Sequence, residues 1–229
     1  MRIAIVRHGE PDYARDCLTE LGRLQAKKAA ERLRDEGIGE IWSSPLGRAR
    51  ETAAAAAEAL GLPIRTLDFM RELTWGSTDG APLFAGGHPW AIVGEMAKQG
   101  IALNRPDWRD SPNFRTNRAT ECIDGVEQGI DGWLAGYGYL REESGYRRAE
   151  EEKEPRTVAL FAHGGSSCAA LGRILDLPFP FACAAFRLDF TSVTVVQLDG
   201  RAGAAFPCLE LLNDARHIRD LCAGERTEP

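Results

Sequence analysis

Ile3-Ala4-Ile5-Val6-Arg7-His8-Gly9-Glu10 is the stretch that decides the fold class of this chain. Its four leading apolar residues are rich in β-branched side chains and are soon followed by a glycine, which predicts a buried strand of a parallel sheet. Ligands of open α/β sheets bind beyond the carboxyl ends of such strands, so His8 would lie where a ligand binds. Taken alone, the tetrapeptide 7–10 is equally typical of an ordinary strand-to-loop exit with an exposed arginine and histidine.

Length and composition limit the class of protein. The 229 residues, 44% hydrophobic and 27% charged, predict one globular domain that carries a large insertion. No apolar run approaches the roughly 20 residues of a membrane span, and the N-terminus lacks the pattern of a signal peptide, so we expect a cytoplasmic protein without a membrane partner. The net charge of -6 disfavours nucleic acid as a partner. The six cysteines form no Cys-x-x-Cys pair, which predicts free, mostly buried thiols and no zinc site.

A helix and a strand follow the first loop. Residues 18–36 show apolar positions at helical spacing, with Thr19 as a candidate N-cap and Gly37 as a candidate stop. Residues 38–43 form a short apolar run that predicts a second strand. The alternation of helix and strand indicates a helix packed on a sheet.

The next helix carries a candidate functional arginine. Ser44 suits the N-cap and Pro45 the first position of an alanine-rich helix that ends at Gly61. Arg48 would then lie in the first turn, at the sheet edge where His8 also lies. Without that histidine, a solvated surface charge would be the preferred interpretation of this arginine.

A third strand at 64–67 leads to a loop with Glu72, and residues 81–155 then form an insertion that we expect to cap the strand ends. Within the insertion we predict helices at 89–99 and 120–134, a β-hairpin at 138–148, and a solvated acidic loop at 150–152 that ends by Pro155. Between the helices lie four arginines, Arg105, Arg109, Arg115 and Arg118.

A second buried strand, 157–162, also stops at a histidine. His163-Gly164-Gly165 opens a helix that runs to about Leu175, so His163 and Gly164 lie at a helix N-terminus, where backbone N–H groups favour an anion. Two strand ends of this kind in one sheet place both imidazoles at a common edge, and core histidines would not need glycines beside them. Further along, residues 185–190 and 192–198 predict two strands joined by a tight turn, which indicates an antiparallel edge.

Five motifs in order resemble the histidine phosphatase superfamily, also called phosphoglycerate mutase-like. They are Arg7-His8-Gly9-Glu10, Leu18-Thr19 with Gly22 and Gln25-Ala26, Ser43-Ser44-Pro45-Leu46 with Arg48-Ala49 and Thr52-Ala53, Glu72 with Gly76, and His163-Gly164. The resemblance covers residues 3 to about 218 and is weakest at 81–155. It implies a three-layer α/β/α sandwich with a mostly parallel sheet and an antiparallel edge strand, together with a covalent phosphohistidine mechanism.

The chemistry of each residue type agrees with the roles that the resemblance implies. A neutral imidazole has one bare nitrogen that can attack phosphorus, which makes His8 the candidate nucleophile. Arg7, Arg48 and His163, with Gly164, can bind phosphate and stabilise its equatorial oxygens. Glu72 is the candidate general acid for the leaving alkoxide and can later activate water. This scheme requires neither a metal nor a cofactor.

Three functions remain open, and we rank a phosphatase of small phosphorylated metabolites first. The family's mutases have an asparagine six residues after the nucleophile, where this chain has Ala14. The insertion's arginines could nevertheless bind a substrate carboxylate as mutases do, so mutase activity is the second hypothesis. A non-catalytic module that binds phosphorylated ligands is the third, but such a module would not need an acid at Glu72. The sequence determines neither the substrate nor the oligomeric state.

Other conspicuous residues have simpler interpretations. We expect His88 to stack beside a tryptophan rather than touch substrate, and His217 to be structural. Glu10 is equally compatible with a contact near the nucleophile and with a local hydrogen bond. Cys168 has no basic neighbour in the sequence, which favours an inert buried thiol.

Overall fold

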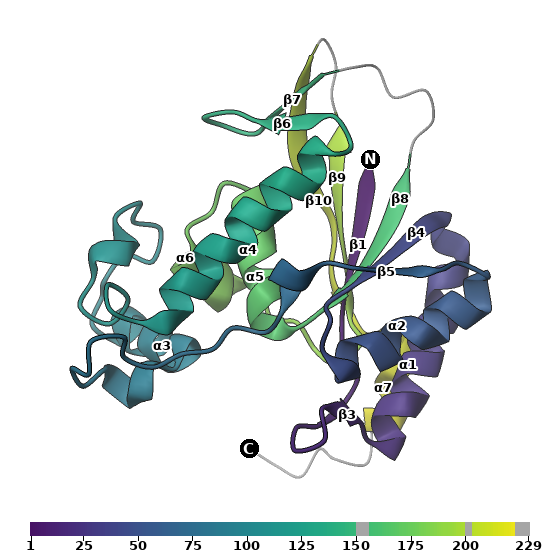
Figure 1. Cartoon of the computed structure of the whole chain (residues 1–229), viewed down its shortest axis with the longest axis horizontal. Coiled ribbons are helices and arrows are strands. Elements are labelled where there is room, and N and C mark those ends of the chain that lie inside the picture. Colours follow the sequence, from purple (N-terminus) through teal and green to yellow (C-terminus); the bar gives the residue numbers. More distant parts are fainter. Residues whose placement is uncertain (150–155, 200–202, 223–229) are drawn as a thin grey trace.

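A single eight-stranded sheet with the order β5-β4-β8-β1-β9-β10-β7-β6 forms the centre of the protein. The computed structural model describes residues 1–149, 156–199 and 203–222 (Figure 1). The strands of this sheet are β1 (Arg2–Arg7), β4 (Ile38–Ser43), β5 (Ile64–Thr66), β6 (Tyr139–Arg141), β7 (Tyr146–Arg148), β8 (Thr157–Ala162), β9 (Val193–Asp199) and β10 (Ala204–Asp214). A separate small ribbon pairs β2 (Pro11–Asp12) with β3 (Cys17–Leu18).

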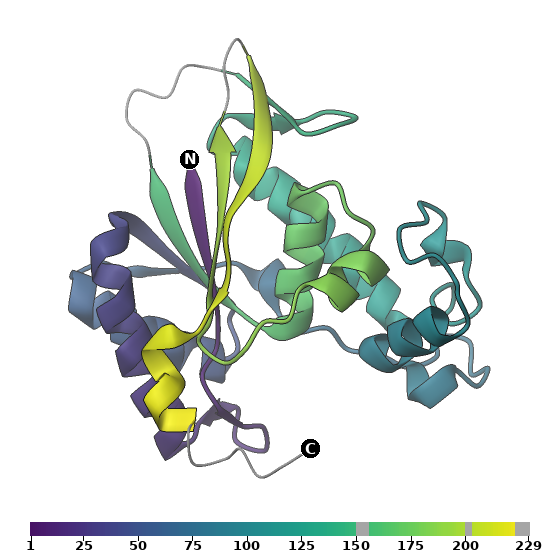
Figure 2. The ribbon, with the colours of Figure 1, turned by 180° about the vertical axis from the view of Figure 1, so that it is seen from behind.

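Helices cover the sheet and connect its strands. The α-helices are α1 (Glu20–Leu33), α2 (Gly47–Leu60), α3 (Pro89–Lys98), α4 (Arg118–Ala135), α5 (Gly164–Ile174), α6 (Phe179–Ala185) and α7 (Arg219–Cys222). Short 3-10 helices are η1 (Arg34–Glu36), η2 (Asp68–Met70), η3 (Phe84–Gly87), η4 (Trp108–Asp110) and η5 (Arg216–Ile218). Seen from behind, α1, α2 and α7 lie on one side of the sheet and α4, α5 and α6 on the other (Figure 2).

The alternation of side chains along β1 explains the three layers. Ile3 and Ile5 belong to the core that packs against α4 and α5, whereas Ala4 and Val6 belong to the core that packs against α1 and α2. A strand segment that is buried on both faces must be apolar, as the four buried residues 3–6 of β1 are. The three-layer α/β/α fold that the family resemblance implied is therefore confirmed.

Four strands, β5, β4, β8 and β1, run parallel and form the half of the sheet that the sequence predicted best. β8 begins and ends at the predicted residues, and Val6 pairs with Phe161 in the parallel register of β1 and β8. β4 also matches its predicted bounds. Because these strands are parallel, their carboxyl ends meet at one edge of the sheet.

The antiparallel half is wider than the predicted edge strand. β9 pairs with β1, β10 with β9, and the hairpin β6–β7 continues the sheet beyond β10. The predicted strand at 185–190 is wrong, because residues 179–185 form α6 and irregular chain follows up to β9. Pro178 is the N-cap of α6, Pro180 lies in its first turn, and the alanine-rich run favours a helix. The long strand β10 was not predicted.

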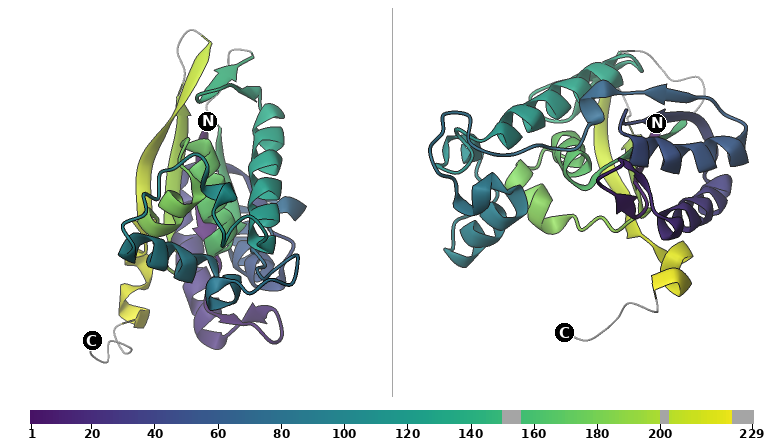
Figure 3. Two further views of the ribbon diagram at one scale, coloured as in Figure 1. Left: turned by 90° about the vertical axis from the view of Figure 1, so that its left-hand side faces the viewer. Right: turned by 60° about the horizontal axis from the view of Figure 1, so that its bottom comes forward.

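The insertion 81–155 contains the predicted helices and hairpin. α3 and α4 match the predicted helices to within a residue or two, and β6 and β7 form the predicted hairpin. The hairpin lies at the end of the sheet where β1 begins, whereas α3 lies far from it (Figures 1 and 3). The predicted acidic loop at 150–152 and Pro155 lie outside the described residues.

Helix ends show which capping predictions are correct. Thr19 caps α1 by accepting a hydrogen bond from Gly22 N at 3.0 Å, and Gly37 and Gly61 end their helices with left-handed φ angles of 66° and 68°. Ser44 does not cap α2, which begins at Gly47, because its hydroxyl contacts a side chain of the site instead.

Two further expectations, on the burial of the cysteines and on membrane-spanning helices, can be compared with the structure. Cys168 and Cys183 are buried, but Cys17 and Cys122 are half-buried and Cys208 is exposed, so the expectation of mostly buried thiols is wrong for the described cysteines. In the described part of the chain no single helix is long and apolar enough to cross a membrane, although α5 and α6 would pass together as a pair bent by 119°.

Candidate active site

The carboxyl ends of neighbouring parallel strands bring two imidazoles together. His8 follows β1 and His163 follows β8, and their ring centroids are 5.1 Å apart. Both side chains are buried, with exposed fractions of 1% and 0%. Ser44 follows β4, the next strand, and its Oγ lies 2.8 Å from His163 Nε2. The site therefore begins where the topology places three adjacent strand ends.

Hydrogen bonds fix the tautomer of His8. Its Nδ1 lies 2.7 Å from Gly9 O, and since a carbonyl only accepts, Nδ1 carries the proton. Nε2 is then the bare nitrogen, and Arg48 Nε donates to it at 3.4 Å. Burial, with the charges of Arg7 and Arg48, lowers the pKa of His8 to about 3. The imidazole is neutral at physiological pH.

The loop after His8 is held by close backbone contacts. A Cβ on Gly9 would lie 2.6 Å from Gly22 O, so only glycine allows the loop to approach α1 this closely. Gly9 N donates to Thr52 Oγ1 at 3.1 Å, and the Thr52 hydroxyl donates in turn to Arg48 O. These bonds tie the turn after His8 to α2.

Arg48 is oriented by a carboxylate that sequence reasoning missed. Asp16 Oδ1 pairs with Arg48 Nη1 at 2.6 Å, and Asp16 Oδ2 accepts from Gly47 N at 2.7 Å. Partial burial would raise the pKa of Asp16, but these hydrogen bonds hold it below its usual value. Asp16 adopts a φ of 50°, which places its side chain at the start of α2. No sequence motif marks it, because it lies within the loop between β2 and β3.

Arg7 lies on the same edge against the irregular chain that precedes β9. Its Nη1 donates to Leu188 O at 2.6 Å, and its guanidinium lies 4.3 Å from the centroid of the Phe190 ring. The Phe190 ring also lies 5.7 Å from that of His8. Both histidine and arginine are therefore packed against one aromatic side chain.

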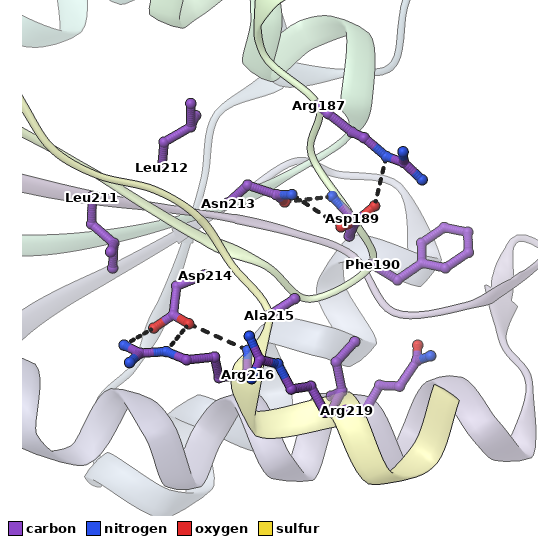
Figure 4. Close-up of a pocket in the computed structure, with 12 residues that line it drawn as sticks. Arg187, Asp189, Phe190, Leu211, Leu212, Asn213, Asp214, Ala215, Arg216 and Arg219 are labelled. Carbon is purple, nitrogen blue, oxygen red and sulfur yellow. Dashed lines mark hydrogen bonds and ion pairs between the residues drawn. The ribbon is translucent and has the colours of Figure 1, made fainter. Parts of the chain in front are cut away.

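The C-terminal part of β10 anchors the segment that carries Phe190. Asn213 Oδ1 accepts from Asp189 N at 2.7 Å, and Asn213 Nδ2 donates to Asp189 Oδ2 at 3.0 Å (Figure 4). Arg187 pairs with the same carboxylate at 3.4 Å. A cavity of about 870 Å³, separate from the one described below, lies between residues 187–190, β10 and α7 (Figure 4).

Glu72 occupies the N-terminus of α5. Its Oε1 accepts hydrogen bonds from Leu73 N, Gly165 N and Ser166 N at 2.9, 3.0 and 3.2 Å. A Cβ on Gly165 would lie 2.6 Å from this oxygen, so the glycine makes the approach possible. The helix N-terminus that we expected to favour a ligand's anionic group thus holds the Glu72 carboxyl. Burial outweighs these bonds and raises the pKa of Glu72.

Arg7, Glu72 and Gly164 line a cavity of about 610 Å³. His8, His163 and Arg48 are in contact with one another but are not among its lining residues. We call His8, His163, Arg7, Arg48 and Glu72 the polar floor. The other wall of the cavity includes Tyr13, Trp75, His88 and Trp90. All of the residues singled out from the sequence as a candidate catalytic set are therefore brought to one place.

The remaining singled-out residues lie as follows. His88 lies beside tryptophan as expected, with centroid distances of 4.6 Å to Trp75 and 5.7 Å to Trp90 in edge-on and tilted contacts, and it also lines the cavity. Glu10 accepts from Thr19 Oγ1 at 2.7 Å and is occupied by that local bond. His217 contacts Thr191 Oγ1 at 3.3 Å, outside the floor. Burial raises the pKa of Cys168 to about 12, as expected for an inert thiol.

None of the insertion's four arginines lines the cavity of the polar floor. Arg105 pairs with Asp107, and Arg109 pairs with Asp124 and Glu127. Among the described residues, no group of three or more His, Cys, Asp or Glu side chains is placed to hold a metal ion.

The fold and site define an α/β protein with two buried histidines and two arginines at the carboxyl edge of its sheet. The model of the histidine phosphatase superfamily (branch 1) matches residues 3–206, and the chain belongs to this superfamily.

Individual relatives include both mutases and phosphatases. A probable phosphoglycerate mutase of Yersinia pestis is 39% identical over 92 residues, a match that covers 36% of this chain and only 43% of that protein. A mycobacterial glucosyl-3-phosphoglycerate phosphatase, solved with inorganic phosphate, is 26% identical with a TM-score of 0.64 over 94% of this chain and 98% of that one. The phosphoserine phosphatase of Entamoeba histolytica, solved with 3-phosphoglyceric acid, is 19% identical with a TM-score of 0.62 over 95% and 98% of the two chains, and shares the fold.

Proposed function

We propose that this protein hydrolyses small phosphomonoesters through a phosphohistidine on His8. One observation carries the proposal: two buried imidazoles lie 5.1 Å apart, with Arg48 donating to the bare nitrogen of His8. Neutral imidazole is a competent nucleophile, and guanidinium groups match the oxygens of a phosphoryl group. The site therefore combines a nucleophile with charge stabilisation, which are the main requirements of phosphoryl transfer.

In the first step, His8 Nε2 attacks phosphorus and the bond from phosphorus to the ester oxygen breaks. The leaving oxygen takes a proton from Glu72, whose raised pKa favours the protonated acid. Arg7, Arg48 and His163 would stabilise charge on the equatorial oxygens. In the second step, Glu72 accepts a proton from water as the water attacks the phosphohistidine, which releases phosphate and restores both groups.

Two unpaired donors support phosphate as the ligand. Arg7 Nε and His163 Nδ1 are buried and have no hydrogen-bond partner among the described residues. His163 Nε2 faces the Ser44 hydroxyl, which itself accepts from Leu46 N at 3.3 Å and so is free to donate its proton to that nitrogen. When the Ser44 hydroxyl donates to Nε2, the proton of His163 is on Nδ1, which has no acceptor among the described residues. Buried donors normally find partners, and phosphate oxygens would satisfy both.

Phosphatase activity is favoured over mutase activity by the contacts around the floor. A mutase must hold the dephosphorylated substrate and exclude water, which needs binding groups beyond the phosphate site. Ala14 supplies no polar side chain, and Arg105 and Arg109 are paired elsewhere. The name of the Yersinia relative is the observation that favours a mutase, and it keeps phosphoglycerate interconversion as the second candidate.

The test measures phosphate release from p-nitrophenyl phosphate and traps the enzyme that becomes phosphorylated by a substrate with a labelled phosphoryl group. We expect release without added metal or bisphosphoglycerate, and an acid-labile, base-stable phosphoryl group on His8. His8→Asn should abolish both, whereas His217→Asn, a matched control outside the floor, should retain the label. Rapid interconversion of 2- and 3-phosphoglycerate with negligible phosphate release would make the mutase hypothesis correct. Labelling that persists in His8→Asn would refute the proposed nucleophile.

A further inference from the structure

Beyond the polar floor, the cavity has a wall of aromatic rings. We define the aromatic wall as Trp75, His88 and Trp90, which line the same cavity as Arg7 and Glu72. The cavity volume of about 610 Å³ lies within the roughly 300–1,000 Å³ typical of sites for drug-sized ligands. A phosphoryl group on the floor would leave much of this space for the rest of the substrate.

The wall exposes rings that a folded protein usually buries. Trp75 and Trp90 are 41% and 36% exposed, whereas Trp108 and Trp133 are buried in the core. Tyr13, 67% exposed, lies at the same cavity with its ring 5.4 Å from the Arg48 guanidinium. Exposed apolar rings gathered at one cavity mark a binding surface rather than scattered surface residues.

A buried amide holds the wall in place. Asn117, 1% exposed, accepts from Gly76 N at 3.2 Å and donates to Gly87 O at 2.8 Å. These two glycines adjoin Trp75 and His88, so one side chain links the two segments that carry these rings. Because the rings are positioned before a ligand arrives, binding costs less conformational entropy.

The wall also adjoins the floor directly. A Cβ built on Gly164 would lie 3.8 Å from both the Arg7 guanidinium carbon and Trp90 Cζ2. The Trp90 ring therefore lies close to a phosphate held by Arg7.

Charges around the cavity disfavour a second anionic group on the substrate. Glu72 and Asp189 are among the lining residues, and either would repel a carboxylate if ionised. Arg187 also lines the cavity, but it pairs with Asp189 and its side chain is 88% exposed, so solvent screens its charge. The rest of the lining is largely apolar, including Cys183, Ala184 and Phe186.

We infer that the aromatic wall is a subsite for an uncharged planar ring, and that the substrate is a phosphomonoester whose alcohol part carries such a ring. The inference rests on the proposed function for the phosphate end and adds the class of the leaving group. Offset or edge-to-face contact with Trp75 and Trp90 would bind the ring.

The test compares benzyl phosphate with cyclohexylmethyl phosphate, which differ in planarity but little in size. We expect kcat/KM for the benzyl ester to be about fivefold higher, because contacts between aromatic rings add to the burial of apolar surface. Trp75→Leu and Trp90→Leu should each bring the ratio of kcat/KM for the benzyl ester to kcat/KM for the cyclohexylmethyl ester close to one. Phe206→Leu removes another exposed ring, 64% exposed on β10, and should leave the ratio unchanged. 3-Phosphoglycerate should be a poorer substrate than the benzyl ester.

Binding of the corresponding phosphonates by calorimetry separates the two proposals. Tighter binding of benzylphosphonate than of cyclohexylmethylphosphonate, lost in the tryptophan variants, supports the subsite even if neither ester is hydrolysed, and in that case the proposed hydrolysis is wrong. Hydrolysis of both esters at equal efficiency, or a ratio that survives in both tryptophan variants, overturns the subsite. A preference for 3-phosphoglycerate overturns it as well.

Discussion

The polar floor and the aromatic wall are built in opposite ways although residues of both line one cavity. Each floor side chain is fixed by another group: Gly9 O holds His8, Asp16 holds Arg48, and the amides of α5 hold Glu72. The wall consists of partly exposed rings that contact each other edge-on or tilted. Buried polar groups that are held by hydrogen bonds are suited to catalysis, because they move little during the reaction. Exposed aromatic rings are suited to binding and selecting a ligand.

The two regions also differ in their origin along the chain. The floor comes mainly from the ends of β1 and β8 and the start of α2, while Trp75 lies in a loop and His88 and Trp90 belong to the insertion. Changes in the insertion can therefore alter the substrate without altering the floor. We therefore expect substitutions in the floor to lower the rate for every ester, and substitutions in the wall to change only the relative rates for different esters.

The largest effect in these comparisons should come from Glu72→Gln. The amide oxygen can still accept from the α5 N–H groups, but the side chain can no longer give a proton to the leaving oxygen. We expect kcat/KM, which covers only the steps up to formation of the phosphohistidine, to fall about 10² to 10⁴-fold for benzyl phosphate and much less for p-nitrophenyl phosphate, because nitrophenolate leaves without a proton. Steady-state kinetics on both esters measures this. An equal loss on both would argue against Glu72 as the acid.

A smaller effect should follow from Asp16→Asn, since Asp16 acts through Arg48 rather than on the substrate. We expect kcat/KM to fall about tenfold on all esters, as for loss of a charge-assisted hydrogen bond. In the Arg48→Ala background, Asp16→Asn should cause no further loss of kcat/KM. In the Trp75→Leu background, it should cause the same roughly tenfold loss as in the unmodified protein. A double-mutant cycle measures both couplings. Full additivity with Arg48→Ala would contradict the positioning role.

The last prediction concerns stability against acid rather than activity. His8 has a folded pKa far below its unfolded value of about 6.5, so the unfolded chain binds more protons below that pH. The stability that neutral His8 contributes is present above about pH 6.5 and is lost as the pH falls toward 3. The loss amounts to at most about 1.4 kcal/mol per pH unit.

Urea unfolding at pH 7.5 and pH 5 should therefore show a smaller loss of unfolding free energy for His8→Gln than for the unmodified protein. Trp75→Leu should retain the full loss, since the wall tryptophan does not titrate. Equal acid losses in all three proteins would show that His8 does not contribute to the pH dependence of stability.

The sequence was most informative where local pattern and burial agree. The buried residues of β1 and β8 are apolar because both faces are covered, and each strand is followed by a histidine beside glycine. These features predicted the parallel half and the place of His8 and His163. By contrast, residues 185–190 were predicted as a strand, but residues 186–190 form an irregular segment that Asn213 anchors and that places Phe190 against Arg7.

What the sequence by itself determined is the parallel strands and the strand ends that carry His8 and His163, because short-range periodicity encodes them, while the family resemblance of its motifs implied the three-layer architecture and the other floor residues. The tertiary structure alone decided the partners: Asp16 for Arg48, Ser44 for His163, and the α5 amides for Glu72. It also decided that the long strand β10 and the hairpin β6–β7 complete the sheet and that Trp75 meets His88. These contacts join residues far apart in the chain, and a local pattern carries no information about which distant group will satisfy a buried charge or pair with an open strand edge.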